Sequence, residues 1–132
     1  MDGSMATYAD VVEGVRATMA AYTHALDDGR TDDVVATYWP DGVFDMPGLG
    51  TYEGHEALRK AYAGWKPRVP QRHLVVNTLV TDWNGDEASA VSDVVLVVQS
   101  DSGWAVQFVA RYHDTLHHDG EVWKFRARRV EA

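Results

Sequence analysis

The second half of the sequence constrains the fold most, because four long strand-like runs follow one another there. Short connectors rich in Gly, Asn and Asp separate the runs, and such residues are typical of tight hairpin turns. The runs are Arg72–Trp83, Glu87–Gln99, Trp104–His117 and Val122–Val130. They predict an antiparallel meander. Long strands twist and bend, so we expect a curved sheet whose concave face is covered by other elements.

A long amphipathic helix is predicted at the start of the chain. Between Tyr8 and Asp28 the apolar residues recur at steps of three and four, which places them on one face of a helix. Thr7 and Asp10 form the pattern of a capping box, and Gly29 occupies the position of a left-handed C-cap. This helix is the first candidate to cover the sheet.

Shorter elements connect this helix to the meander. A short helix is expected with Thr31 as its N-cap, and a third helix is expected over His55–Trp65. Val43–Met46 reads as a short strand, and the glycine-rich stretch Pro47–Gly54 reads as a loop. Helices followed by strands indicate an α+β domain, in which a curled sheet and its helices enclose a pocket open at one end.

Composition limits the domain count and the partners. The chain of 132 residues suits a single domain, predicted over residues 6–132, after a cloning scar or disordered start at residues 1–5. The absence of cysteine excludes disulfides and thiolate chemistry, and it fits a cytoplasmic location. A net charge of -8 argues against binding nucleic acid. No apolar run approaches the roughly 20 residues of a membrane span.

Three residues are candidates for chemistry. Tyr22 lies on the buried stripe of the first helix, and Asp27 lies at the border of that stripe. His73 lies near the start of the first long strand, where alternation places Asn77 on the same face. Both faces of this strand are largely apolar, so both are expected to be covered. A solvated aspartate and a structural histidine remain equally compatible with these patterns.

The later strands contain aromatic and histidine residues. Alternation places Trp104, Phe108 and Tyr112 on one face of the third long strand, as core residues or as the wall of a pocket. His113 and His117 share a face but lie about 13 Å apart, at a rise of ~3.4 Å per residue. That separation is too large for one metal ion, so no metal site is predicted.

Several runs resemble the SnoaL-like branch of the nuclear transport factor 2-like superfamily. These runs are Tyr22–Arg30, Tyr38–Phe44, Tyr52–Leu58, Arg72–Asn77, Arg111–Asp114 and Gly120–Arg129. The resemblance extends from about Tyr8 to Arg129. It implies a cone-shaped α+β barrel, with a curved antiparallel sheet around a long N-terminal helix and two shorter helices. It also implies a homodimer formed through the outer face of the sheet.

Within that superfamily the site pattern is most similar to the scytalone dehydratase and bile-acid dehydratase group. Those enzymes pair a helix aspartate with a strand histidine, and Asp27 and His73 occupy the matching positions. Tyr22 matches a tyrosine of the bile-acid enzymes, and Arg128 matches their late arginine. The fungal enzyme has a tyrosine directly before its aspartate where this chain has Leu26, which leaves the substrate open.

The resemblance therefore implies a cofactor-independent lyase or isomerase of dehydratase type. Asp27 and His73 would form the general base, Tyr22 would donate a hydrogen bond to an enolate, and the Pro47–Gly54 loop would gate the pocket. The substrate would be a small cyclic, largely apolar carbonyl or enol compound. Its expected contacts are Asn77, Arg128, Phe108, Tyr112, Trp65, Tyr52 and Trp104.

Other functions on the same fold remain open. A non-catalytic domain would use the pocket only to bind a hydrophobic ligand, and an interaction domain would use only its dimer face. Polyketide-type cyclases and epoxide hydrolases share the fold. In the ketosteroid isomerase branch the catalytic base would fall at Met46, which cannot act as one.

Overall fold

The computed structural model describes residues 6–132, so the scar or disordered start expected at residues 1–5 lies outside the described residues. The elements follow in the order α1 (Tyr8–Asp27), α2 (Thr31–Ala36), β1 (Tyr38–Met46), β2 (Gly50–Glu53), α3 (His55–Gly64), β3 (Gln71–Trp83), β4 (Glu87–Ser100), β5 (Gly103–His118) and β6 (Trp123–Glu131). Among these described residues, no helix combines the length and the apolar character that crossing a membrane requires.

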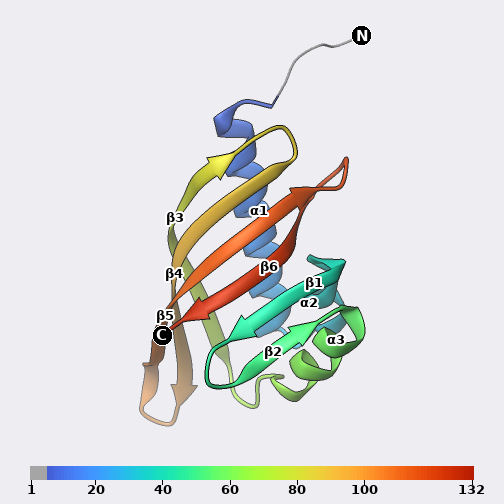
Figure 1. Ribbon diagram of the computed structural model, residues 1–132. Coiled ribbons are helices and arrows are strands. Elements are labelled where there is room, and N and C mark those ends of the chain that lie inside the picture. The colour runs from blue at the N-terminus through green and yellow to red at the C-terminus, as the bar shows by residue number, and fades with distance from the viewer. Residues whose placement is uncertain (1–5) are drawn as a thin grey trace.

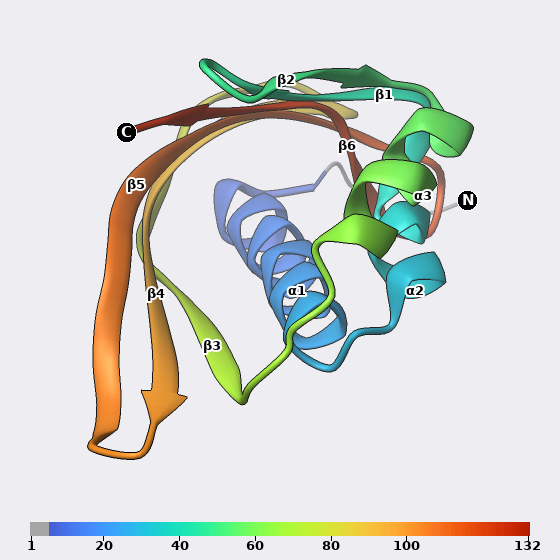
Figure 2. The same ribbon diagram turned by 90° about the horizontal axis from the view of Figure 1, so that it is seen from below.

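The strands form one curved sheet in the order β2-β1-β6-β5-β4-β3. The sheet wraps around α1, while α2 and α3 lie beside α1 on the side that the sheet leaves open (Figures 1 and 2). The α+β class and the antiparallel meander are confirmed. The sheet is mixed, however, because β1 pairs with β6 in parallel, and it does not close into a barrel.

The first helix forms as its sequence predicts. Thr7 accepts a hydrogen bond from the backbone of Asp10, and Asp10 accepts one from the backbone of Thr7, which completes the capping box. Gly29, with φ of 72°, then reverses the chain in the left-handed conformation that glycine adopts without strain. The apolar face of α1 contributes Val11, Val15 and other residues to the core.

Three local predictions are wrong between α1 and the meander. Strand β1 begins at Tyr38, and the stretch predicted as a loop contains β2, because a turn with a hydrogen bond from Leu49 N–H to the Met46 carbonyl closes a hairpin. Thr31 is the first residue of α2 and not its cap, and its buried hydroxyl has no hydrogen-bond partner among the described residues.

Two irregularities in strand pairing change which side chains face the helix. In β3, Asn77 adopts a φ of 49°, and the register with β4 shifts there. In β5, Gln107 is an extra residue, since Leu96 lies opposite Phe108 whereas Val97 lies opposite Val106. Such β-bulges interrupt the alternation of side chains between the two faces of a sheet.

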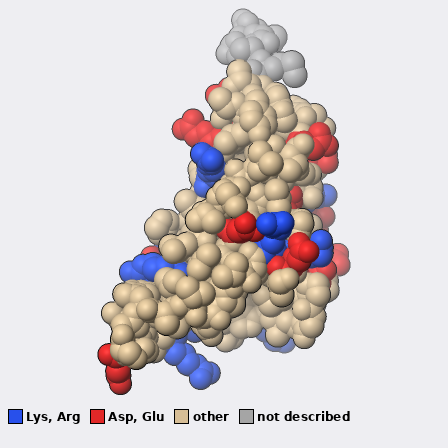
Figure 3. All heavy atoms as spheres, turned by 90° about the vertical axis from the view of Figure 1, so that its left-hand side faces the viewer, with Lys and Arg blue, Asp and Glu red and all other residues tan. Residues whose placement is uncertain are grey.

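The outer face of the sheet is uncovered within a single chain. Leu74, Val76 and Leu79 of β3 are between 46% and 54% exposed, so the prediction that both faces of this strand are covered is wrong for one copy. Figure 3 views the side on which β4 and β5 curve around the helix, and it shows wide areas without charged side chains.

Candidate active site

A cavity of about 340 Å³ lies between α1, α3 and the concave face of the sheet. Its walls are mainly apolar and aromatic, and they include Leu26, Phe44, Met46, Trp65 and Phe108. This volume is at the lower end of the range for pockets that bind small molecules. The cavity therefore suits a small, largely apolar ligand.

The structure brings Asp27 and His73 together at this cavity. The Nδ1 atom of His73 lies 2.7 Å from Oδ1 of Asp27, and the backbone N–H of His73 donates to Oδ2 at 2.8 Å. The side chain of His73 is only 9% exposed, and that of Asp27 is only 6% exposed. One carboxylate thus holds both the ring and the backbone of the same histidine.

Local structure explains why these two residues meet. β3 is an edge strand, so the backbone N–H of His73 that faces away from β4 needs a partner other than a strand. Asp27 is the last residue of α1, where a negative charge is unfavourable unless donors surround it. Gln71, two residues before His73, supplies a further donor to Oδ1 at 3.2 Å. Asp27 therefore accepts three hydrogen bonds from the start of β3.

This arrangement determines the charge of Asp27 and the tautomer of His73. Burial raises the pKa of the Asp27 carboxyl, but the hydrogen bonds from the His73 ring, the His73 backbone and Gln71 outweigh it, so the pKa lies below its ordinary value. An ionised carboxylate only accepts, so the neutral His73 ring carries its proton on Nδ1. The Nε2 lone pair is then available, because no hydrogen bond joins Nε2 to a residue that the structure describes.

Asp27 should make folding sensitive to acid. Because its folded pKa is lowered, its contribution to stability is present above the ordinary value of 3.8 and is lost as the pH falls below it. At pH 7, Asp27→Asn is expected to cost about 1–3 kcal/mol of unfolding free energy. Urea unfolding at pH 7 and pH 3 should show this difference shrinking in acid. A difference that stays constant with pH would contradict the description of Asp27.

Three tyrosine hydroxyls form a buried chain of hydrogen bonds. Tyr22 OH lies 2.5 Å from Tyr62 OH, which lies 2.7 Å from Tyr38 OH. Burial raises the pKa of all three phenols, so each remains a neutral group able to donate. Tyr22 and Tyr62 line the cavity. The sequence predicts the helix that carries Tyr62 but no hydrogen-bond partner for its hydroxyl, because nothing in the spacing of that helix indicates a partner on α1.

Arg128 lies behind the cavity wall and does not line it. Its guanidinium donates from Nε to Asp114 Oδ1 at 2.7 Å and from Nη2 to Oδ2 at 2.9 Å, and both side chains are fully buried. Although burial opposes it, the charge of Asp114 keeps the pKa of Arg128 well above its ordinary value. The guanidinium also stacks on the rings of Tyr22 and Tyr112, so the prediction that Arg128 contacts substrate is replaced by a role inside the core.

The other predicted binding residues divide into two groups. Phe108, Tyr112 and Trp65 line the cavity. Tyr52 lies against Trp65, with 5.4 Å between ring centroids, and supports the wall from outside the lining. Leu49, within the predicted gating stretch, lines the cavity and is 52% exposed.

Asn77 and Trp104 lie outside the cavity because of the two bulges. The Asn77 side chain is exposed and donates to Asp93 at 2.8 Å, so the prediction that it shares the space of His73 is wrong. Trp104 precedes the Gln107 bulge, is 48% exposed and lies under the Arg72 guanidinium, so it does not share the inner face with Phe108.

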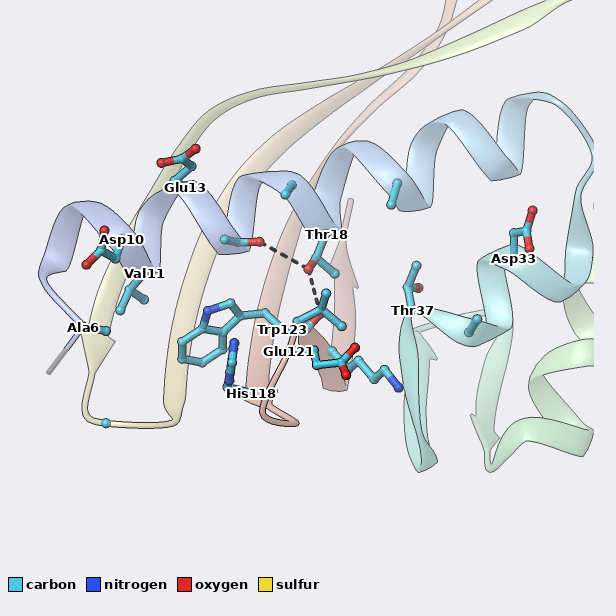
Figure 4. A pocket seen from close by; sticks show the side chains of 17 residues that line it. Ala6, Asp10, Val11, Glu13, Thr18, Asp33, Thr37, His118, Glu121 and Trp123 are labelled. Atoms are coloured by element: carbon cyan, nitrogen blue, oxygen red, sulfur yellow. Dashed lines mark hydrogen bonds between the residues drawn. The ribbon is translucent and has the colours of Figure 1, made fainter. Parts of the chain in front are cut away.

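A larger groove of about 780 Å³ runs along the other side of α1 (Figure 4). Small residues of α1 and the Trp123 ring form its walls, and the Thr18 hydroxyl donates to the Trp123 carbonyl at 2.7 Å. Its histidine, His118, packs on Trp123 and accepts a hydrogen bond from the backbone of its own turn. Since His118 has these local contacts, the smaller cavity with His73 is the better candidate site.

Comparisons with known proteins agree with this architecture. A model of the SnoaL-like domain matches residues 7–129. A candidate aromatic ring hydroxylase from Novosphingobium aromaticivorans superposes with a TM-score of 0.84 at 24% identity, over 96% of this chain and 91% of its own. A candidate scytalone dehydratase from the same organism superposes with a TM-score of 0.80 at 19% identity. The match covers 91% of this chain and 82% of that protein. A Catenulispora acidiphila protein in complex with S-DNPA superposes with a TM-score of 0.83 at 24% identity, and the match covers 93% of each chain. No curated protein matches in sequence. At these identities the solved structures support the fold alone.

Proposed function

The chain belongs to the SnoaL-like branch of the nuclear transport factor 2-like superfamily, and we propose that it is a cofactor-independent lyase or isomerase of dehydratase type. The observation that carries this proposal is the Asp27–His73 pair at the wall of a small apolar cavity. A base held by a carboxylate in such a place suits the removal of a proton from carbon. The proposed substrate is a small cyclic carbonyl or enol compound with a hydroxyl group β to the carbonyl.

The proposed reaction uses His73, which lines the cavity, and its partner Asp27. His73 Nε2 removes the proton α to the carbonyl, and the C–H electron pair forms an enolate. The enolate then re-forms the carbonyl while the bond to the β-hydroxyl breaks, and the proton on Nε2 joins the leaving hydroxide as water. Asp27 stabilises the imidazolium between these two steps. In an isomerisation, the proton would return to a different carbon of the enolate.

Tyr22 is the proposed donor to the enolate oxygen. Tyr22 lines the cavity, and its neutral hydroxyl belongs to the chain with Tyr62 and Tyr38, which can adjust its hydrogen bonds as charge develops. Donors placed at a developing oxyanion commonly contribute more to the rate than proton transfer alone.

A panel assay tests the proposal. Purified protein without added cofactor or metal should convert at least one cyclic β-hydroxy ketone to its enone, which is followed by the new absorbance of the conjugated carbonyl. Buffer alone and heat-denatured protein are the controls. If the protein binds members of the panel but accelerates none of them, the domain is a binding module and the proposed reaction is wrong.

We also propose that a second copy of the chain covers the outer face of the sheet. Five apolar side chains on β3 and β5 are between 46% and 61% exposed there, and such a continuous patch is unusual on a soluble monomer. They are Leu74, Val76, Leu79, Val106 and Val109. The Arg111–Asp93 ion pair lies on the same face beside Val76, so an isologous contact between two copies would bury this pair together with the apolar side chains.

A charge on this face should separate the two copies. Val109→Lys places an ammonium group in the middle of the patch, where Val109 is 60% exposed and can be replaced without disturbing the core. The expected result is a dimer for the original protein and a monomer for this variant in sedimentation velocity. Val122→Lys, at a 51% exposed position between β5 and β6, is the matched control and should remain dimeric. A monomeric original protein would refute the proposal.

A further inference from the structure

Tyr112 forms part of the cavity wall, where its hydroxyl is a polar group in a mainly apolar and aromatic lining. It lies on the inner face of β5, opposite Ser92 of β4 and Val130 of β6. The residue is 4% exposed and lines the cavity that contains His73. Its side chain is therefore almost wholly enclosed at the wall of this cavity.

The Tyr112 hydroxyl makes no hydrogen bond with the part of the chain that the structure describes. The neighbouring hydroxyls of Tyr22, Tyr38 and Tyr62 bond to one another instead. Buried polar groups in proteins nearly always have a partner. Among the described residues, only Thr31 and Arg128 have a side-chain polar atom that is fully enclosed and without a partner. The Tyr112 hydroxyl is not enclosed in this way, so a molecule in the cavity can reach it.

The surroundings of the ring favour donation by this hydroxyl. The Arg128 guanidinium lies 3.7 Å from the centroid of the Tyr112 ring and 4.4 Å from that of Tyr22. Two hydrogen bonds to Asp114 fix the guanidinium in place. A cation over the face of a phenol draws electron density from the ring, which strengthens the O–H group as a donor. Burial raises the pKa of Tyr112 while Arg128 opposes the rise, so the phenol keeps its proton.

We propose that the Tyr112 hydroxyl is the hydrogen-bond donor that anchors an oxygen atom of the ligand in this cavity. The ligand class is then a ring compound with a carbonyl, enolate or phenolate oxygen. This inference deepens the proposed function and rests on it for the identity of the enolate. Tyr112 is then a second donor to the ligand beside Tyr22, whose hydroxyl is also hydrogen-bonded to Tyr62. The inference also gives Arg128 and Asp114 a role in the site, which is to hold and polarise the Tyr112 ring.

Phenolate binding tests the inference without a known substrate. The probe is 4-nitrophenolate, whose ionised oxygen mimics an enolate, and nitrobenzene is the matched probe without that oxygen. Tyr112→Phe keeps the ring and its contact with Arg128 but removes the donor. Binding of 4-nitrophenolate, measured by calorimetry, should weaken roughly tenfold to a hundredfold, as expected when a hydrogen bond to a charged group is lost. Binding of nitrobenzene should change by less than about threefold.

The outcomes separate this inference from the proposed function. His73→Asn should retain phenolate binding, because it leaves Tyr112 in place. Suppose that the original protein dehydrates no ketone but that Tyr112→Phe weakens the binding of 4-nitrophenolate and not that of nitrobenzene. The donor role is then supported and the proposed reaction is refuted. If dehydration occurs but Tyr112→Phe weakens the binding of both probes equally, or of neither probe, the donor role is refuted. Failure of the original protein to bind 4-nitrophenolate would also refute the donor role.

Discussion

His73→Asn is expected to lower kcat for dehydration by roughly a hundredfold to ten-thousandfold, which is the contribution of a positioned general base. Asparagine is close in size to the ring, and its amide can still donate to Asp27, so the start of β3 should keep its structure. KM should change by only about twofold to threefold, because the lost interaction acts in the transition state and not in ground-state binding. The measurement is steady-state kinetics on the ketone found in the panel assay.

His113→Asn is the matched control for this prediction. His113 contacts Glu131 on the outer side of the sheet at 2.7 Å and does not line the cavity. Its replacement should leave kcat unchanged. The two substitutions remove the same chemical group from opposite faces of one sheet. A His73→Asn protein that retains kcat within about threefold would exclude His73 as the base.

Asp114→Ala is expected to destabilise the protein by about 3–5 kcal/mol, the usual result of removing one partner of a buried ion pair. The guanidinium of Arg128 would remain fully buried without its carboxylate, and one of its nitrogen atoms, Nη1, already has no partner among the described residues. Urea unfolding followed by tryptophan fluorescence measures the loss. A typical small domain has a total stability of about 5–15 kcal/mol, so this single change removes a large share.

Two further variants show whether the buried pair is the cause. The double variant Asp114→Leu/Arg128→Met replaces both charges with apolar groups and should recover most of the lost stability. Arg59→Ala breaks an exposed ion pair, in which the side chain of Arg59 is 52% exposed and that of Asp32 is 82% exposed. This change should lower the free energy of unfolding by less than about 1 kcal/mol. If Asp114→Ala costs no more than Arg59→Ala, the buried pair does not have the structural role described for it.

The parts of the fold that local sequence determines were predictable. The period of α1, its capping box and the hairpin connectors each depend on neighbouring residues, and all of them appear in the structure. The parallel pairing of β1 with β6 was not predictable, because it joins segments about 85 residues apart, and no local signal reports it. The hairpin of β1 and β2 was missed because glycines that favour a loop also permit a tight turn.

The site was predictable where a resemblance to known enzymes supplied the pairing. Asp27 and His73 lie together as that resemblance implies, although periodicity alone left both residues with ordinary structural explanations. Asn77 and Trp104 were misplaced because alternation assumes regular strands, and one bulge in each strand reverses the faces. The Tyr62 hydroxyl was missed because its partner Tyr22 lies 40 residues earlier, on another helix.

The central claim is that Asp27 holds His73 as a base whose Nε2 lone pair faces the ligand. The most direct test is the tautomer of His73, read from the ¹⁵N shifts of its ring nitrogens in long-range ¹H–¹⁵N spectra at neutral pH. The account predicts a protonated Nδ1 and an unprotonated Nε2 in the original protein, with loss of this preference in Asp27→Asn. A ring that carries its proton on Nε2, or one that is indifferent to Asp27→Asn, would contradict the account.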